Sequence, residues 1–124
     1  MSDKNISPVG WYIGSYLLRF IELNDTNNDD IEERFMSWEN TIIVKANSMD
    51  EAYDKVVANA QLSTDAYEGG PDKVPVQWVF EGITDLLPIY EELEDGSEVM
   101  WAEHNPRKLK NLRKRIKNKD ELKQ

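Results

Sequence analysis

The sequence predicts an α+β domain in which an antiparallel sheet carries one amphipathic helix. Residues 41–46 are mostly β-branched and apolar, and such residues favour a strand. Residues 48–60 then place apolar side chains at helical spacing, whereas the other strong patterns before residue 104 alternate as strands do. Since a single apolar stripe on a helix must be buried against another element, a sheet is expected to cover it.

Residues 11–23 are predicted to form a long strand with two apolar faces. Alternating positions place Tyr12, Tyr16, Leu18 and Phe20 on one face, and Trp11, Ile13, Leu17 and Ile21 on the other. A strand with one solvated face would be polar there, so both faces of this strand are expected to be covered. After an acidic loop at 24–34, residues 35–46 return as the partner strand.

Ser48 is predicted to cap a helix over residues 48–60. Glu51 follows three residues later, and this spacing is typical of a capping box, which satisfies backbone N–H groups at the start of a helix. The apolar stripe consists of Met49, Ala52, Tyr53, Val56, Val57 and Ala60. Polar residues occupy the other side, so a single face of the helix is expected to pack on the sheet.

Three further strands are predicted after the helix, over residues 76–83, 89–93 and 98–103. Residues 68–72 have the composition of a turn, and Gly82 indicates a bulge or a close backbone approach. Residues 85–88 are predicted to form a short link, and Asp95-Gly96 is a dipeptide typical of hairpin turns. The predicted order is β-β-α-β-β-β, an antiparallel sheet of about five strands.

Residues 105–124 are predicted to form a basic C-terminal helix. Asn105 would cap it, and Pro106 would open its first turn, where proline is favoured. Its apolar stripe is thin and consists of Leu109, Leu112 and Ile116. The predicted organisation is a flexible N-terminus at 1–10, an α+β domain at 11–104 and this helix at 105–124.

Charge is distributed unevenly along the chain. Nine of the 15 Lys and Arg residues lie in 105–124 and are opposed there by two acids, so this basic arm carries a net +7. The rest of the chain, the acidic body, holds six bases and 22 acids, a net −16. Such asymmetry is evidence about partners, because charge steers encounters between molecules.

Composition excludes several kinds of chemistry. Cysteine is absent from the sequence, so disulfides, thiolate nucleophiles, iron–sulfur clusters and thiolate zinc sites are ruled out. Residues 1–10 lack the apolar core of a signal peptide. The apolar stretch at 11–23 is interrupted by Arg19 and Glu22 and is too short to span a bilayer as a helix. We therefore expect a cytoplasmic protein without a membrane partner.

Two isolated motifs favour structural roles over chemical ones. Asp25, Asn27 and Asp29 match the first ligand positions of a calcium loop, but the glycine and the bidentate glutamate that such a loop requires are missing. We interpret this segment as a solvated acidic turn. His104, the single histidine, has no identified nucleophile or further ligands beside it and is interpreted as a linker residue. No catalytic residue, metal site or cofactor is predicted.

An acidic cluster surrounds the predicted hairpin. Its members are Glu91, Glu92, Glu94, Asp95 and Glu98. Two carboxylates held close together in a cleft could act as a general acid and a general base. On a hairpin tip they would be solvated, so we interpret them as an edge that discourages strand pairing between molecules.

Aromatic residues recur in the predicted strands, namely Trp11, Trp38, Trp78 and Trp101 together with Tyr12, Tyr16 and Phe80. Such residues could form a stacking platform for bases or a ligand pocket. Because all of them follow strand periodicity, packing in the core or in a dimer interface is the expected role. Since the helix covers one face of the sheet, the other face or the C-terminal helix is predicted to meet a second copy in a homodimer.

Four segments in order and spacing carry a resemblance to a known family: WYIGSYLLRF, ANSMDEAYDKVVANA, VQWVFEGITDLLPIYEELEDG and SEVMWAE. They resemble the small bacterial family called domain of unknown function 4288, over residues 11–103. This family has no established activity, so the resemblance implies no catalytic residue, cofactor or partner. The basic arm lies outside the resemblance.

The basic arm is the strongest functional signal, and its candidate contact residues are Arg107, Lys108, Lys110, Arg113, Lys114, Arg115 and Lys117. Cations on nearly every side suit contact with phosphates without reading of bases. The acidic body would repel nucleic acid beyond the arm. Docking of the arm on an acidic body, in the same copy or in a second one, is therefore an equally physical outcome.

These observations lead to a non-catalytic macromolecule-binding protein whose acidic surface contacts a basic partner protein, in a role such as an inhibitor or an immunity factor. The alternative is a sequence-independent nucleic-acid binder that uses the basic arm. An enzyme with an unrecognised carboxylate site is a third interpretation, and no motif favours it.

Overall fold

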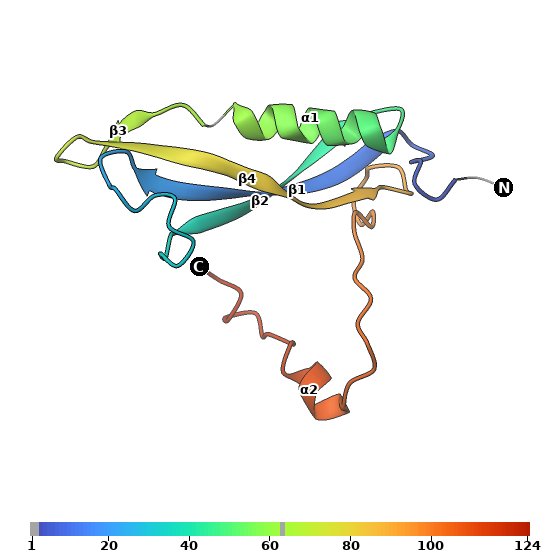
Figure 1. Cartoon of the computed structure of the whole chain (residues 1–124). Helices are drawn as coiled ribbons and strands as arrows, with labels where there is room; N and C mark the ends of the chain where they lie inside the picture. Colours follow the sequence, from blue (N-terminus) through green and yellow to red (C-terminus); the bar gives the residue numbers. More distant parts are fainter. Residues whose placement is uncertain (1–2, 63) are drawn as a thin grey trace.

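The computed structural model describes residues 3–62 and 64–124 of the chain (Figure 1). Its elements are β1 (Trp11–Glu22), β2 (Ser37–Lys45), α1 (Met49–Gln61), β3 (Tyr67–Gly69), β4 (Val74–Pro88) and α2 (Leu109–Arg113). The four strands of this described part form one antiparallel sheet in the order β2-β1-β4-β3, and α1 packs across one of its faces. The predicted α+β class is confirmed.

The long strand β1 lies at the centre of the sheet. It pairs with β2 from Trp11↔Lys45 to Arg19↔Ser37, and with β4 from Tyr12↔Pro88 to Glu22↔Val76. The register between β1 and β4 shifts twice, once on each side of Gly82, as the sequence predicts for this glycine. Extra residues on one strand bend and twist it, and the sheet is therefore curled.

The core lies between α1 and the sheet, and its buried residues are Tyr12, Tyr16, Leu18, Val44, Ala46, Ala52, Val56 and Ala60. Gly14 on β1 permits a close approach of the helix, because a Cβ atom at this position would lie 2.4 Å from Cγ2 of Val56. Tyr53, a member of the predicted stripe, is exposed. The buried stripe of α1 is therefore narrower than the sequence predicts.

Ser48 caps α1, as predicted. Its Oγ accepts a hydrogen bond from the backbone N–H of Glu51 at 3.1 Å. The Glu51 carboxylate accepts a hydrogen bond in turn from the backbone N–H of Asn47 at 3.2 Å. The reciprocal bond thus reaches one residue further back than in the usual capping box, and it still satisfies an N–H group at the start of the helix.

Strand β4 is longer than predicted. Residues 85–88, predicted to be a link, continue this strand beyond the register shifts and remain paired with β1. Strand β3 occupies residues 67–69, where the predicted turn at 68–72 begins, and the turn itself follows at Gly70 and Lys73, which both have positive φ. Polar residues beside the bulges interrupt the apolar–polar alternation of the sequence, but the pairing of β4 with β1 continues past them.

The two strands predicted around Asp95-Gly96 are wrong. The turn forms, because the backbone N–H of Ser97 donates to the carbonyl three residues earlier at 3.0 Å. Residues 89–93 and 98–103 nevertheless form no ladder in the described structure, and the sheet has four strands where about five are predicted. Ile89 is buried against the end of β1, and the acidic residues that follow it repel one another, which disfavours close pairing of strands.

The predicted C-terminal helix is also wrong in its length. α2 has five residues and follows Lys108, whose side chain makes no capping hydrogen bond, so Asn105 and Pro106 do not open it. In the described part of the chain, α2 packs against no other helix or strand. A short helix without tertiary contacts is marginal in water, and neighbouring cations repel one another along it.

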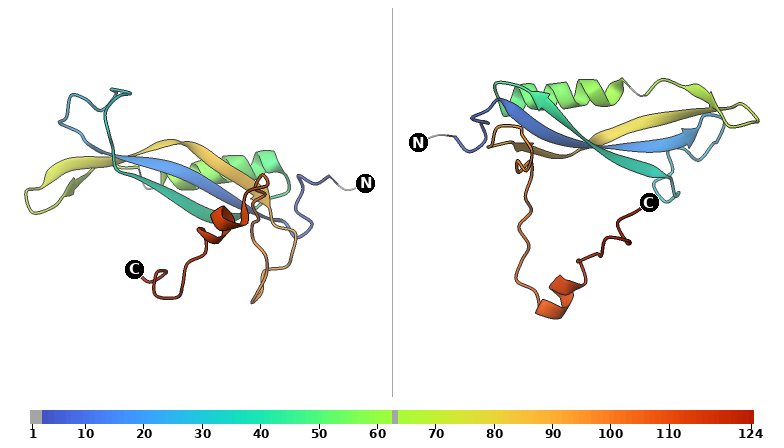
Figure 2. Two further views of the ribbon diagram at one scale, coloured as in Figure 1. Left: turned by 90° about the horizontal axis from the view of Figure 1, so that it is seen from below. Right: turned by 180° about the vertical axis from the view of Figure 1, so that it is seen from behind.

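The face of the sheet opposite α1, here called the distal face, carries no helix of the described structure (Figures 1 and 2). Ile13 of β1 lies on it, between Ile43 of β2 and Leu87 of β4. Figure 1 shows the chain after the last strand descending away from this face to α2. Within one chain, α1 therefore covers one of the two apolar faces of β1, and the predicted homodimer contact on the other stays a prediction.

Candidate functional site

An aromatic cluster lies toward the end of the sheet that α1 leaves open. It consists of Phe20 on β1, Trp38 on β2 and Trp78 on β4. The ring centroids of Phe20 and Trp78 are 5.1 Å apart, those of Trp38 and Trp78 are 4.9 Å apart, and both pairs are tilted. Figure 1 shows α1 above one half of the sheet, and the approach of Val56 to Gly14 identifies this half as the one near the start of β1.

The cluster is open to solvent at Trp38. This side chain is 56% exposed, and Met36, two residues before it, is also exposed. Core packing was one of two roles expected of the aromatic residues. It is confirmed for Tyr12 and Tyr16 but is wrong for Trp38 and Trp101, which are both exposed within this chain. Interface packing stays a prediction for the exposed pair.

The acidic loop at 24–34 borders the aromatic cluster. Phe20 and Met36 line a groove that Asp25 and Glu33 also line. Every carboxylate of this loop is exposed. An apolar surface with a charged border results, in which the carboxylates outnumber the cation of Arg34. An apolar centre with a polar rim is typical of protein interfaces.

Arg19 holds the acidic loop in place. Its guanidinium donates to the backbone carbonyl of Asn28, and its Nε donates to Glu81 Oε1 at 3.0 Å. The same guanidinium lies 4.6 Å from the centroid of the Phe35 ring, within the range of a cation–π contact. The contact with Asn28 thus ties the loop to β1, and the other two hold the guanidinium against β4 and against Phe35, which follows the loop.

The residues that resemble a calcium loop do not converge on a site. Asp25 Oδ1 accepts a hydrogen bond from the backbone N–H of Asn27 at 2.9 Å, and the Asn28 side chain donates to the Glu22 carbonyl at 2.7 Å. Such bonds stabilise turns. Across residues 3–62 and 64–124, no three His, Asp or Glu side chains are placed to hold a metal ion. His104 is exposed in the segment before α2.

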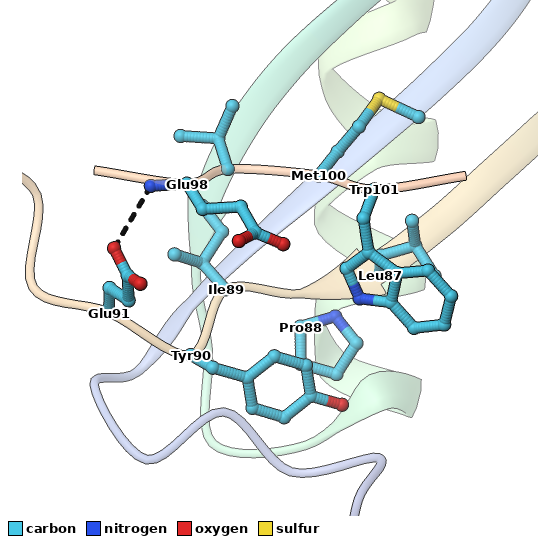
Figure 3. A pocket seen from close by; sticks show the side chains of 9 residues that line it. Leu87, Pro88, Ile89, Tyr90, Glu91, Glu98, Met100 and Trp101 are labelled. Carbon is cyan, nitrogen blue, oxygen red and sulfur yellow. Dashed lines mark hydrogen bonds between the residues drawn. The ribbon is translucent and has the colours of Figure 1, made fainter. Parts of the chain in front are cut away.

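A cavity of about 100 Å³ lies beside the end of β4 (Figure 3). Its lining includes the apolar side chains of Leu87, Met100 and Trp101 and two carboxylates of the acidic cluster, Glu91 and Glu98. Glu91 Oε2 accepts a hydrogen bond from the backbone N–H of Glu98 at 3.0 Å. Small-molecule sites typically enclose about 300–1,000 Å³, so this cavity has room for one side chain rather than for a metabolite.

The candidate contact residues of the basic arm are all exposed. They are Arg107, Lys108, Lys110, Arg113, Lys114, Arg115 and Lys117, on α2 and on the segments at its two ends. The structure groups them with neither the aromatic cluster nor the cavity. Their role in binding stays a prediction.

These features define a small α+β protein with a curled antiparallel sheet, one packed helix and exposed apolar surfaces bordered by acidic residues. Residues 11–101 match the family described as a domain of unknown function (DUF4288), and the chain belongs to this family. The match confirms the resemblance of the sequence and stops short of the basic arm. No curated protein and no solved structure matches the chain. None of the helices in the described residues is long and apolar enough to cross a membrane.

Proposed function

We propose that this protein is a non-catalytic binding protein whose acidic surface contacts a basic partner protein. One observation carries the proposal: Trp38 is more than half exposed, and its ring packs at a tilt against Trp78 next to the acidic loop. Tryptophan is enriched among the residues that anchor protein interfaces, and surrounding acids accelerate the encounter with a basic partner. A role as an inhibitor or an immunity factor uses a surface of this kind.

In the proposed contact, the partner places an apolar side chain against Trp38 and Met36. Its Lys or Arg residues then face Asp25 and Glu33 at the edge of the groove. The rigid strand positions of the two aromatic rings reduce the conformational entropy that the interface loses on binding. The acidic loop contributes more to the association rate than to the lifetime of the complex.

Affinity capture from the native lysate with the full chain, followed by titration of the captured protein, tests this proposal. We expect Trp38→Ala to weaken binding by about tenfold or more, because truncation of an anchor residue costs about 2 kcal/mol. Tyr53→Ala removes another exposed aromatic side chain, on α1 and outside the aromatic cluster, and serves as the matched control. Equal affinities of Trp38→Ala and the unmodified chain would exclude this surface.

The alternative function is sequence-independent binding of nucleic acid through the basic arm. The exposure of every candidate cation, together with the absence of packing around α2 in the described structure, favours it. Affinity for a DNA duplex of random sequence, measured at two salt concentrations, tests this alternative. Binding should weaken steeply with salt, and Arg113→Ala should reduce both affinity and the salt slope, whereas Lys73→Ala on the acidic body should change neither.

A further inference from the structure

The distal face carries a row of aliphatic side chains that ends at the cavity of Figure 3. Ile43, Ile13 and Leu87 are direct neighbours across β2, β1 and β4. Leu87 also lines the cavity, where Met100 and Trp101 continue the apolar surface. We call these five residues the distal patch. Within one chain Ile43, Met100 and Trp101 are exposed, whereas Ile13 is buried, so the patch presents apolar surface to solvent on β2 and around the cavity.

The cavity at the end of the distal patch has the chemistry to receive a cationic side chain. Glu98, Trp101 and Glu91 all line it, and Figure 3 shows the carboxylate of Glu98 lying between Glu91 and the ring of Trp101. The aliphatic stem of a Lys or Arg can lie along apolar walls while its charged head reaches a carboxylate or the face of an indole. The volume of about 100 Å³ suits a single side chain of this length.

The basic arm has the complementary features. Leu109, Leu112 and Ile116 are exposed along it, between cations that give the arm a net +7. The arm begins only a few residues after Trp101, and Figure 1 shows the chain leading away from its own sheet as far as α2 and turning back toward the sheet beyond it. In the described structure, α2 packs against no strand or helix. The aliphatic residues and the cations of the basic arm are therefore exposed to solvent in the described structure.

We propose that the basic arm of one copy docks on the distal patch of a second copy, and that two chains exchange arms in this way to form a homodimer. Leu109, Leu112 and Ile116 cover the aliphatic row, and a cation of the arm enters the cavity between Glu98 and Trp101. The net +7 of the arm meets an acidic body of net −16, so the charges are complementary. This proposal goes beyond the binding function above, because it concerns the opposite face of the sheet.

Paired charge reversals in the full chain test this arrangement. The cavity variant reverses two charges of the cavity (Glu91→Lys with Glu98→Lys). The arm variant reverses two charges of the arm (Arg113→Glu with Lys117→Glu). Light scattering across a concentration series should give twice the 14.4 kDa chain mass for the unmodified protein. Each variant alone should dissociate at a concentration about tenfold higher or more, since charges of like sign then face each other where the arm meets the cavity.

A mixture of the two variants distinguishes exchange between chains from docking within a chain. In the mixed dimer, each arm meets a cavity of opposite sign, so self-association should recover to the level of the unmodified protein. Docking within one chain predicts no recovery on mixing. The control variant Asp54→Lys with Asp65→Lys makes the same charge change as the cavity variant, but on the α1 side of the sheet. This control should dimerise normally.

Three outcomes would overturn the proposal: a 14.4 kDa particle at every concentration of the unmodified chain, normal dimerisation of either variant alone, or a mixture that stays monomeric. All proteins are measured free of nucleic acid, and circular dichroism verifies that each variant is folded. DNA binding by a strictly monomeric chain would assign the arm to the alternative function. Because these measurements need no partner protein, their result is independent of the proposed function of the aromatic cluster.

Discussion

The two halves of the α1 side of the sheet carry similar strand patterns and have different surroundings. Near the start of β1, Tyr12 is fully buried, and Val56 packs against Gly14. Toward the other end, Trp38 is more than half exposed. The 13 residues of α1 span about 20 Å, whereas the 12 residues of β1 span about 40 Å. The periodicity of the sequence therefore indicates which face of the sheet a residue occupies. The relative lengths of the helix and the strands indicate whether the helix covers that residue.

The largest effect that sharpens this comparison is expected at Tyr12. Tyr12→Ala leaves a large cavity under α1 and should lower the free energy of unfolding by about 3–5 kcal/mol, as truncation of a buried aromatic residue does. Urea denaturation of the purified chain measures the change. Tyr53→Ala, at a half-exposed position beside the buried stripe of α1, is the control and should lower the free energy of unfolding by clearly less than Tyr12→Ala does. A small effect of Tyr12→Ala would show that α1 does not cover the half of the sheet near the start of β1.

An intermediate effect is expected where α1 approaches the sheet most closely. Gly14→Ala introduces a Cβ atom 2.4 Å from Cγ2 of Val56, and the resulting overpacking should lower the free energy of unfolding by about 1–3 kcal/mol. Val56→Ala removes the methyl groups that clash, so the double variant should be more stable than the sum of the two single changes predicts. Simple additivity would indicate that the helix is not held this close to β1.

The smallest effect is expected at the open half. Trp38→Ala removes a large side chain, but the loss is mainly one tilted ring pair, so the free energy of unfolding should fall by about 1 kcal/mol. The same urea titration provides the measurement. A loss as large as that of Tyr12→Ala would mean that the cluster belongs to the core, and it would remove the main support for a binding surface there.

Much of the central fold could be predicted from the sequence because local and long-range signals agree there. Ser48 and Glu51 define the start of α1, and the two-sided apolar pattern of residues 11–23 predicts the central strand. Gly82 marks the irregular pairing of β4 because a residue without Cβ adapts to a distorted ladder. In each of these cases the residue type and the packing favour the same conformation.

The remaining elements depend on packing that composition does not reveal. Asp95-Gly96 forms its turn, but a turn cannot create a hairpin when the flanking residues are acidic and have no sheet edge to join. Asn105 and Pro106 have the composition of a helix start, but α2 begins only at Leu109 and stays short because no surface supports it in the described structure. The exposure of Trp38 was missed as well, although the unequal lengths of the predicted helix and strands could have indicated it.

The aromatic cluster and the distal patch lie on opposite sides of β1, so occupation of one leaves the other accessible. Two chains joined through their distal patches would each keep an aromatic cluster facing outward. Such a pair is bivalent, and a ligand that repeats its basic site, or one displayed in several copies on a larger assembly, would be retained by avidity even if each single contact were weak.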